Sequence, residues 1–129
     1  MVKIAHIAIW TKDLEALKTF YVRYFDGVSN EKYVNPIKKF ESYFISFESG
    51  PALELMRKES VADGSHDINE RLGITHIAFT LGSKEAVISL TETLRADGYR
   101  IVGEPRTSGD GYFESVFLDV EGNRIELLA

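Results

Sequence analysis

Two segments of this 129-residue chain carry the same short pattern, and this internal repeat limits the folds that the chain can adopt. Each copy begins with an apolar run that contains a histidine, at residues 4–9 and 74–79. Each ends with an apolar run that contains a glutamate, at residues 52–56 and 124–128. The two histidines lie 70 residues apart and the two glutamates 72. Because self-similarity in the same order indicates repeated structural units, we expect two similar modules.

Each copy predicts the same order of secondary structure. A strand-like run is followed by a helical run and then by three further strand-like runs. Capping residues precede each helical run, and an Asp-Gly pair follows it, with the glycine of Asp26-Gly27 expected in a left-handed conformation. The expected strands lie around residues 4–10, 31–34, 41–47, 52–56, 74–81, 99–102, 113–119 and 124–128, and the helices begin near residues 14 and 83.

This order predicts an α+β protein built from two β-α-β-β-β modules. Module 1 covers about residues 1–56 and module 2 about 74–129, and a polar linker at about 57–73 joins them within one domain of residues 1–129. A chain of this length suits two small halves that together make a single domain.

The composition excludes several classes of protein. Without cysteine the chain forms neither a disulfide nor a thiolate zinc site. A net charge of −5 argues against nucleic-acid binding, which needs a basic surface. No apolar stretch approaches the roughly 20 residues of a membrane span, and residues 1–6 do not lead into a signal-peptide pattern. We therefore expect a soluble cytoplasmic protein.

Four ionisable residues interrupt the repeated apolar runs: His6, Glu54, His76 and Glu126. Since side chains alternate between the two faces of a strand, each of the four lies opposite aliphatic neighbours. A carboxylate between leucines is costly to bury unless it is paired or binds a metal. One strand histidine alone is more often a hydrogen-bonded core residue, but a symmetric set of four favours one shared divalent ion. These donors suit several metals, with zinc or nickel expected first and cobalt, manganese or iron as alternatives.

The runs around these residues also resemble a known family. His6-Ile7-Ala8-Ile9, Leu53-Glu54-Leu55, Thr75-His76-Ile77-Ala78-Phe79 and the final stretch from Asp119 to Leu127 are similar to the vicinal oxygen chelate (glyoxalase, bleomycin-resistance and dioxygenase) superfamily. Within it the chain looks most like small bacterial glyoxalase I-type proteins. The resemblance implies that the modules form a curled mixed sheet, a half-barrel around one divalent metal per site. It also implies the four ligands above, a small-molecule substrate and a homodimer.

The activity that the resemblance implies is a metal-dependent lyase of the lactoylglutathione lyase type. Such an enzyme isomerises the hemithioacetal of a 2-oxoaldehyde by proton transfer, with Glu126 as the first choice for the base and Glu54 as the symmetric alternative. Other readings keep the metal and change the reaction to that of an epimerase, a fosfomycin-type transferase or a dioxygenase. A further reading is a non-catalytic protein that binds or sequesters a small molecule.

The sequence says less about the substrate than about the metal site. Glutathione-dependent members of the family usually have an arginine a few residues after the first histidine, whereas this chain has Ile9-Trp10-Thr11. Trp10 shares the face of His6 and lines a substrate pocket or plugs the end of the half-barrel. Arg124, which shares the face of Glu126, meets an anionic substrate or pairs with a carboxylate. Met56 shares the face of Glu54 and is the third candidate contact. The glycine-rich stretch 107–111 is a lid or simply a turn.

Overall fold

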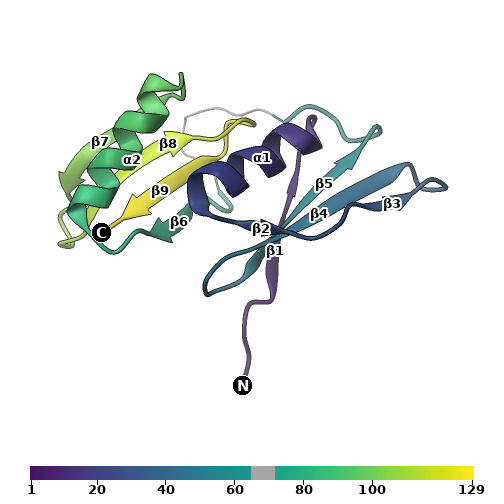
Figure 1. Cartoon of the computed structure of the whole chain (residues 1–129), viewed down its shortest axis with the longest axis horizontal. Coiled ribbons are helices and arrows are strands. Elements are labelled where there is room, and N and C mark those ends of the chain that lie inside the picture. Colours follow the sequence, from purple (N-terminus) through teal and green to yellow (C-terminus); the bar gives the residue numbers. More distant parts are fainter. Residues whose placement is uncertain (65–71) are drawn as a thin grey trace. The chain divides into compact units, whose positions relative to one another are not determined.

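A computed structural model of the protein describes residues 1–64 and 72–129. The chain divides into two compact units, residues 1–64 and 65–129. Each unit consists of one helix packed on one mixed sheet (Figure 1).

The first unit contains six elements. They are β1 (His6–Trp10), α1 (Leu14–Phe25), β2 (Val28–Ser29), β3 (Tyr33–Asn35), β4 (Phe40–Ser46) and β5 (Ala52–Lys58). The strand order is β1-β5-β4-β2, with β3 also paired to β4. The first strand, β1, runs parallel to the last strand, β5, and the other pairs are antiparallel.

The second unit has the same plan with five elements. They are β6 (Ile77–Thr80), α2 (Lys84–Ala96), β7 (Ile101–Thr107), β8 (Phe113–Leu118) and β9 (Arg124–Leu128). The strand order is β6-β9-β8-β7, and again the first strand runs parallel to the last. The predicted α+β class and the two β-α-β-β-β modules are therefore confirmed, and the two mixed sheets are not closed into a barrel.

Several element boundaries differ from the prediction. The short strand β2 was not expected, and β5 extends two residues into the predicted linker, whose residues 65–71 lie outside the described chain. The strand predicted at 99–102 is instead β7, which continues to Thr107. Gly103 and Pro105 obscured this strand in the sequence, because both residues are unfavourable in a regular ladder. Here β7 is an edge strand with register shifts beside Gly103, and such a strand tolerates both residues.

Local hydrogen bonds explain where the helices begin and end. The Asp13 carboxylate accepts from the Ala16 N–H of α1 at 3.0 Å, and the Ser83 hydroxyl accepts from the Ala86 N–H of α2 at 3.1 Å. At the end of α1 the left-handed residue is Asp26, with φ 53°, and not Gly27 as predicted. Gly27 is required for space instead, since a Cβ there would lie 2.5 Å from Cγ2 of Ile45.

The core of each unit lies between its helix and its sheet. In the closing strands every second residue is buried there, namely Leu53 and Leu55 in β5 and Ile125 and Leu127 in β9. The helices contribute Leu14, Leu17, Phe20 and Tyr21 from α1 and Val87 and Leu94 from α2. Burial on alternate positions fixes the opposite face of β5 and β9 as the one that carries Glu54 and Glu126.

Leu55→Ala and Leu127→Ala are each expected to destabilise the protein strongly. Both side chains are fully buried and occupy equivalent positions one residue after the two glutamates. Removing a buried leucine loses apolar burial and leaves a cavity, so the free energy of unfolding should fall by about 2–5 kcal/mol in each case. Urea denaturation followed by circular dichroism measures this. The control Ile88→Ala, at a 46% exposed position on α2, should cost less than about 0.5 kcal/mol.

A polar cluster on the helix side of the first sheet makes the free energy of unfolding depend on pH. The Glu15 carboxylate of α1 lies 2.7 Å from Nζ of Lys32 and accepts from the Tyr43 hydroxyl at 2.9 Å. The hydrogen bond from Lys32, more than that from Tyr43, lowers the pKa of Glu15 below its usual value. A lowered pKa means that this stabilisation is present above the ordinary carboxyl pKa of about 4.3 and is lost as the pH falls through the folded value.

Glu15→Gln is therefore expected to lower the free energy of unfolding at neutral pH by less than about 1 kcal/mol, because the pair is partly exposed. The difference from the wild type should shrink as the pH falls below the lowered pKa of Glu15. Urea denaturation at a series of pH values measures it. A difference that stays constant across that range would show that the Glu15 charge is not responsible.

Candidate metal centre

The first histidine and glutamate are brought together by the parallel pairing of β1 and β5. Ala8 lies opposite Glu54 in this register, and His6 lies two residues before Ala8 on the same face of the sheet. Nε2 of His6 is 3.9 Å from Oε1 of Glu54. The sequence predicted that these two residues share a site, and the strand register gives the physical reason for their proximity.

The second unit repeats this arrangement. Ala78 lies opposite Glu126 in the parallel pairing of β6 and β9, and His76 stands two residues before Ala78, just ahead of the first residue of β6. Nε2 of His76 is 3.4 Å from Oε2 of Glu126. The two pairs are thus equivalent in register, which is the structural counterpart of the repeat in the sequence.

Both pairs lie on the sheet face away from their own helix. The side chains of Glu54 and Glu126 are 18% and 16% exposed, and those of His6 and His76 are 45% and 39% exposed. The four residues are therefore partly accessible and do not belong to the core that their leucine neighbours form. A ligand that approaches this face of either sheet can reach an imidazole nitrogen and a carboxylate oxygen together.

The donor atoms of each pair fit a divalent metal ion. Bonds from such an ion to imidazole nitrogen or carboxylate oxygen are about 2.0–2.2 Å long, so two donors on one ion lie at most about 4.3 Å apart. The observed separations of 3.9 Å and 3.4 Å satisfy this limit and exceed the length of an ordinary hydrogen bond. The described residues, however, include no group of three or more histidine, cysteine, aspartate or glutamate side chains placed to hold a metal ion.

Comparison with known proteins identifies the family. The profile of the Glyoxalase/Bleomycin resistance protein/Dioxygenase superfamily matches residues 3–127. The chain belongs to this superfamily. A protein of Bacillus subtilis (strain 168) described as uncharacterized protein YqjT is 27% identical over 132 residues, with 96% of each chain covered.

Solved structures of the family share the fold. Glyoxalase I of Leishmania major, described as trypanothione-dependent, is 25% identical with a TM-score of 0.79, covering 99% of this chain and 86% of that one. A glyoxalase family protein from Enterococcus faecalis is 26% identical with a TM-score of 0.77, covering 98% and 97%. A glyoxalase I variant from Zea mays is 25% identical with a TM-score of 0.77, and this chain covers 44% of its length. No helix among the described residues is long and apolar enough to cross a membrane.

In this superfamily member the surroundings of Glu126 alter its acidity. Burial raises the pKa of the Glu126 carboxyl above its usual value, while the nearby His76 acts in the opposite direction. The acidic side chains of Glu114 and Asp110 raise it further. A carboxylate whose pKa is raised binds a proton more readily at neutral pH, which suits a group that accepts a proton from a substrate.

The three predicted substrate contacts lie on the same faces as the two pairs. Trp10 is 45% exposed and lies opposite Met56 in the β1–β5 register, two residues beyond Glu54. Its ring contacts that of Phe40 edge-on, with the centroids 6.2 Å apart. Arg124 stands two residues before Glu126 on β9, opposite Leu118 of β8, and is half-buried.

The sequence did not single out the residues that flank the glutamates on β4 and β8. Phe44 lies opposite Glu54, and its ring meets the imidazole of His6 edge-on at 5.4 Å between centroids. Val116 holds the equivalent position opposite Glu126. Only the strand register shows which residue adjoins each glutamate.

The glycine-rich stretch at 107–111 forms a tight hydrogen-bonded turn between β7 and β8. The Ser108 N–H donates to the Tyr112 carbonyl at 2.7 Å, and the Gly111 N–H donates to the Ser108 carbonyl at 3.0 Å. The Ser108 hydroxyl also contacts the Asp110 carboxylate. The glycines therefore serve a turn here, with Gly111 at a positive φ of 92°.

Proposed function

We propose that this protein is a metal-dependent enzyme of the glyoxalase I type, which isomerises the hemithioacetal of a 2-oxoaldehyde and a thiol by proton transfer. One divalent ion, zinc or nickel in the first place, would be held by His6, Glu54, His76 and Glu126. The observation that carries the proposal is the pair of register-equivalent His–Glu contacts, one in each unit, on the face away from the helix.

The two His–Glu pairs are better suited to binding one shared metal ion than to binding one ion each. Each pair offers one nitrogen and one oxygen donor, whereas protein sites for zinc and similar metals use three or four protein ligands. Joining the two pairs supplies four donors and leaves positions for water or substrate. The second pair would come from the same chain or from a second copy in a homodimer, so the proposal includes a dimer as one way to complete the site.

In this proposal the side chains have different roles, namely metal binding and proton transfer. A divalent ion held by these residues would supply Lewis-acid chemistry, which would make the C–H bond beside the substrate carbonyl more acidic. Glu126, on detaching from the ion, would accept that proton and return it to the adjacent carbon. The two histidines would bind the ion through an imidazole nitrogen.

The names of the solved relatives support a glyoxalase I reaction, but they do not identify the thiol that takes part in it. Two solved relatives of about 25% identity are named glyoxalase I, and one is described as trypanothione-dependent. In this chain Trp10 occupies the region where glutathione-dependent members usually have an arginine. The thiol partner is therefore best treated as open, with glutathione and trypanothione both tested.

Two measurements test the proposal. Elemental analysis of protein purified without chelator should find about one divalent ion per four-ligand site. Methylglyoxal should then be consumed with at least one of glutathione, trypanothione, cysteine or bacillithiol after loading with zinc, nickel, cobalt or manganese. Chelator-treated protein is the control. Failure to bind any of these metals would remove the proposed site. Metal binding without turnover would leave the other readings, namely an epimerase, a fosfomycin-type transferase, a dioxygenase or a binding protein.

A further inference from the structure

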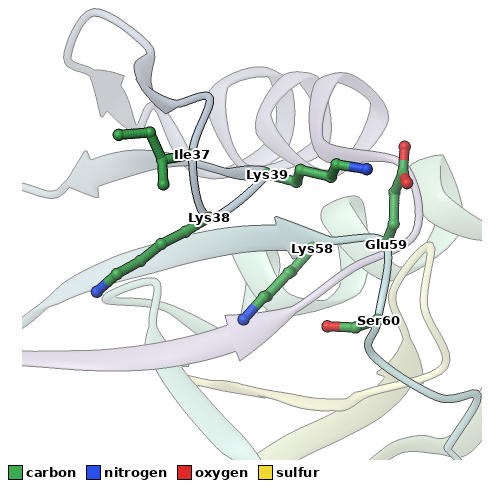
Figure 2. Close-up of a pocket in the computed structure, with 6 residues that line it drawn as sticks. All are labelled: Ile37, Lys38, Lys39, Lys58, Glu59 and Ser60. Atoms are coloured by element: carbon green, nitrogen blue, oxygen red, sulfur yellow. The ribbon is translucent and has the colours of Figure 1, made fainter.

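A cavity of about 380 Å³ opens on the first unit where the β3–β4 turn meets the end of β5. Figure 2 shows its six lining residues, Ile37, Lys38, Lys39, Lys58, Glu59 and Ser60. Its volume falls within the range of small-molecule sites, about 300–1,000 Å³. Three of the six side chains are cationic and one is anionic, so the cavity carries an excess of positive charge.

The lysines are arranged for a ligand of opposite charge. In Figure 2 the side chains of Lys38 and Lys58 extend in the same direction, whereas Lys39 extends toward Glu59. Two lysines that line one concave surface raise the local concentration of anions. Lysine is a compact charge with three donors, which suits carboxylate and phosphate oxygens.

The backbone around these lysines is fixed by hydrogen bonds. In the β3–β4 turn, the Lys38 N–H donates to Oδ1 of Asn35 at 3.0 Å, and Nδ2 of Asn35 donates to the Tyr33 hydroxyl at 3.3 Å. Lys58 is the last residue of β5 and lies opposite Phe40 in the β4–β5 register. The two cations therefore project from a structured turn and a paired strand and are not on a free tail.

One of the residues that line the cavity, Lys58, lies on the sheet face that carries the first His–Glu pair. Glu54, Met56 and Lys58 alternate along β5 and share one face. Four residues along a strand span about 13 Å, so Lys58 lies about that far from Glu54. Between them the face is apolar, formed by Met56 and Trp10, which are register partners. A polar end at Glu54, an apolar middle and a cationic end follow one another along one sheet.

We propose that this cavity binds an anionic group, carboxylate or phosphate, at the far end of an elongated substrate whose reacting end lies at His6 and Glu54. Lys38 and Lys58 supply the charge. This inference rests on the proposed function for the location of the reacting end. It gives this chain a cationic contact from the β3–β4 turn and the end of β5, in place of an arginine next to His6.

Binding can be measured without turnover, because Trp10 is the only tryptophan and lies on the same face. Its fluorescence is titrated in metal-loaded protein with two pairs of probes. S-methylglutathione is compared with its diethyl ester for the carboxylate arm, and hexyl phosphate with hexanol for the phosphate arm. We expect at least one anionic probe to bind about tenfold more tightly than its partner, with a preference that weakens as salt is raised.

Lys38→Gln and Lys58→Gln should each weaken the favoured anionic probe about threefold to tenfold, and the double substitution should abolish the preference over the neutral partner. Lys58→Arg should retain it, because the charge is kept. The matched control is Lys3→Gln, which removes the same charge from a residue that precedes the start of β1 at His6. This substitution should alter binding less than twofold. Thermal melts establish that each variant is folded.

The outcomes separate this inference from the proposed function. Equal binding of anionic and neutral probes, or an unchanged preference in folded Lys38→Gln/Lys58→Gln, would overturn the anion cavity even if methylglyoxal is consumed normally. A lysine-dependent preference in a protein that never acts on a hemithioacetal would retain the anion cavity and overturn the glyoxalase assignment.

Discussion

His6→Ala and His76→Ala are each expected to lower the affinity for divalent metal by about 100-fold or more and to remove most turnover. Loss of a residue that merely orients a metal ligand already costs about 10–100-fold, so loss of a ligand should cost at least as much. The two substitutions should have similar effects, because the two pairs are equivalent in register. Competition with a metal indicator measures the affinity.

The double variant distinguishes one shared ion from two separate ones. If both histidines bind one ion, His6→Ala/His76→Ala should lose little more than either single variant, because residues that act together are not additive. Two independent ions would instead give two losses that add, with half of the metal retained in each single variant. His66→Ala is the matched control, since the third histidine has no counterpart in the repeat. Unchanged metal content in His76→Ala would refute the shared site.

Alternation within each strand was sufficient to predict the face on which the ionisable residues lie. Along β5 and β9, leucine and isoleucine alternate with residues of mixed character, and this period of two assigns one face to the core. Burial confirms that assignment, with Leu55 and Leu127 fully buried and the neighbouring glutamates partly exposed. The parity argument needs only local information, which explains its success.

Features that depend on contacts between residues far apart in the sequence could not be predicted from alternation within one strand. The sequence did not indicate that Ala8 and Ala78 would lie opposite the two glutamates, because register is set by contacts between strands. The role of Gly27 was mistaken for the same reason, since the limit there is the side chain of Ile45 on another strand. The cavity beside Lys58 likewise depends on where the β3–β4 turn meets β5. The joining of the two His–Glu pairs around one ion stays a prediction.

Glu126→Gln is expected to lower kcat by about 10²–10⁴-fold, because glutamine preserves the shape of the side chain and a metal-binding oxygen but cannot accept a proton. Glu54→Gln makes the same chemical change in the other pair and is the matched control. If Glu126 is the base, Glu54→Gln should weaken metal binding, yet its kcat per bound metal ion should stay within about tenfold of the wild type.

Turnover must therefore be divided by the metal content measured in the same sample. That ratio separates a lost base from a lost ligand, which activity alone does not. In the metal-free protein burial raises the pKa of the Glu126 carboxyl, while His76 acts in the opposite direction. The reverse pattern, with kcat per metal lost in Glu54→Gln and retained in Glu126→Gln, would assign the proton transfer to the first module. Equal losses in both variants would mean that the two carboxylates share the proton transfer, as the symmetry of the repeat permits.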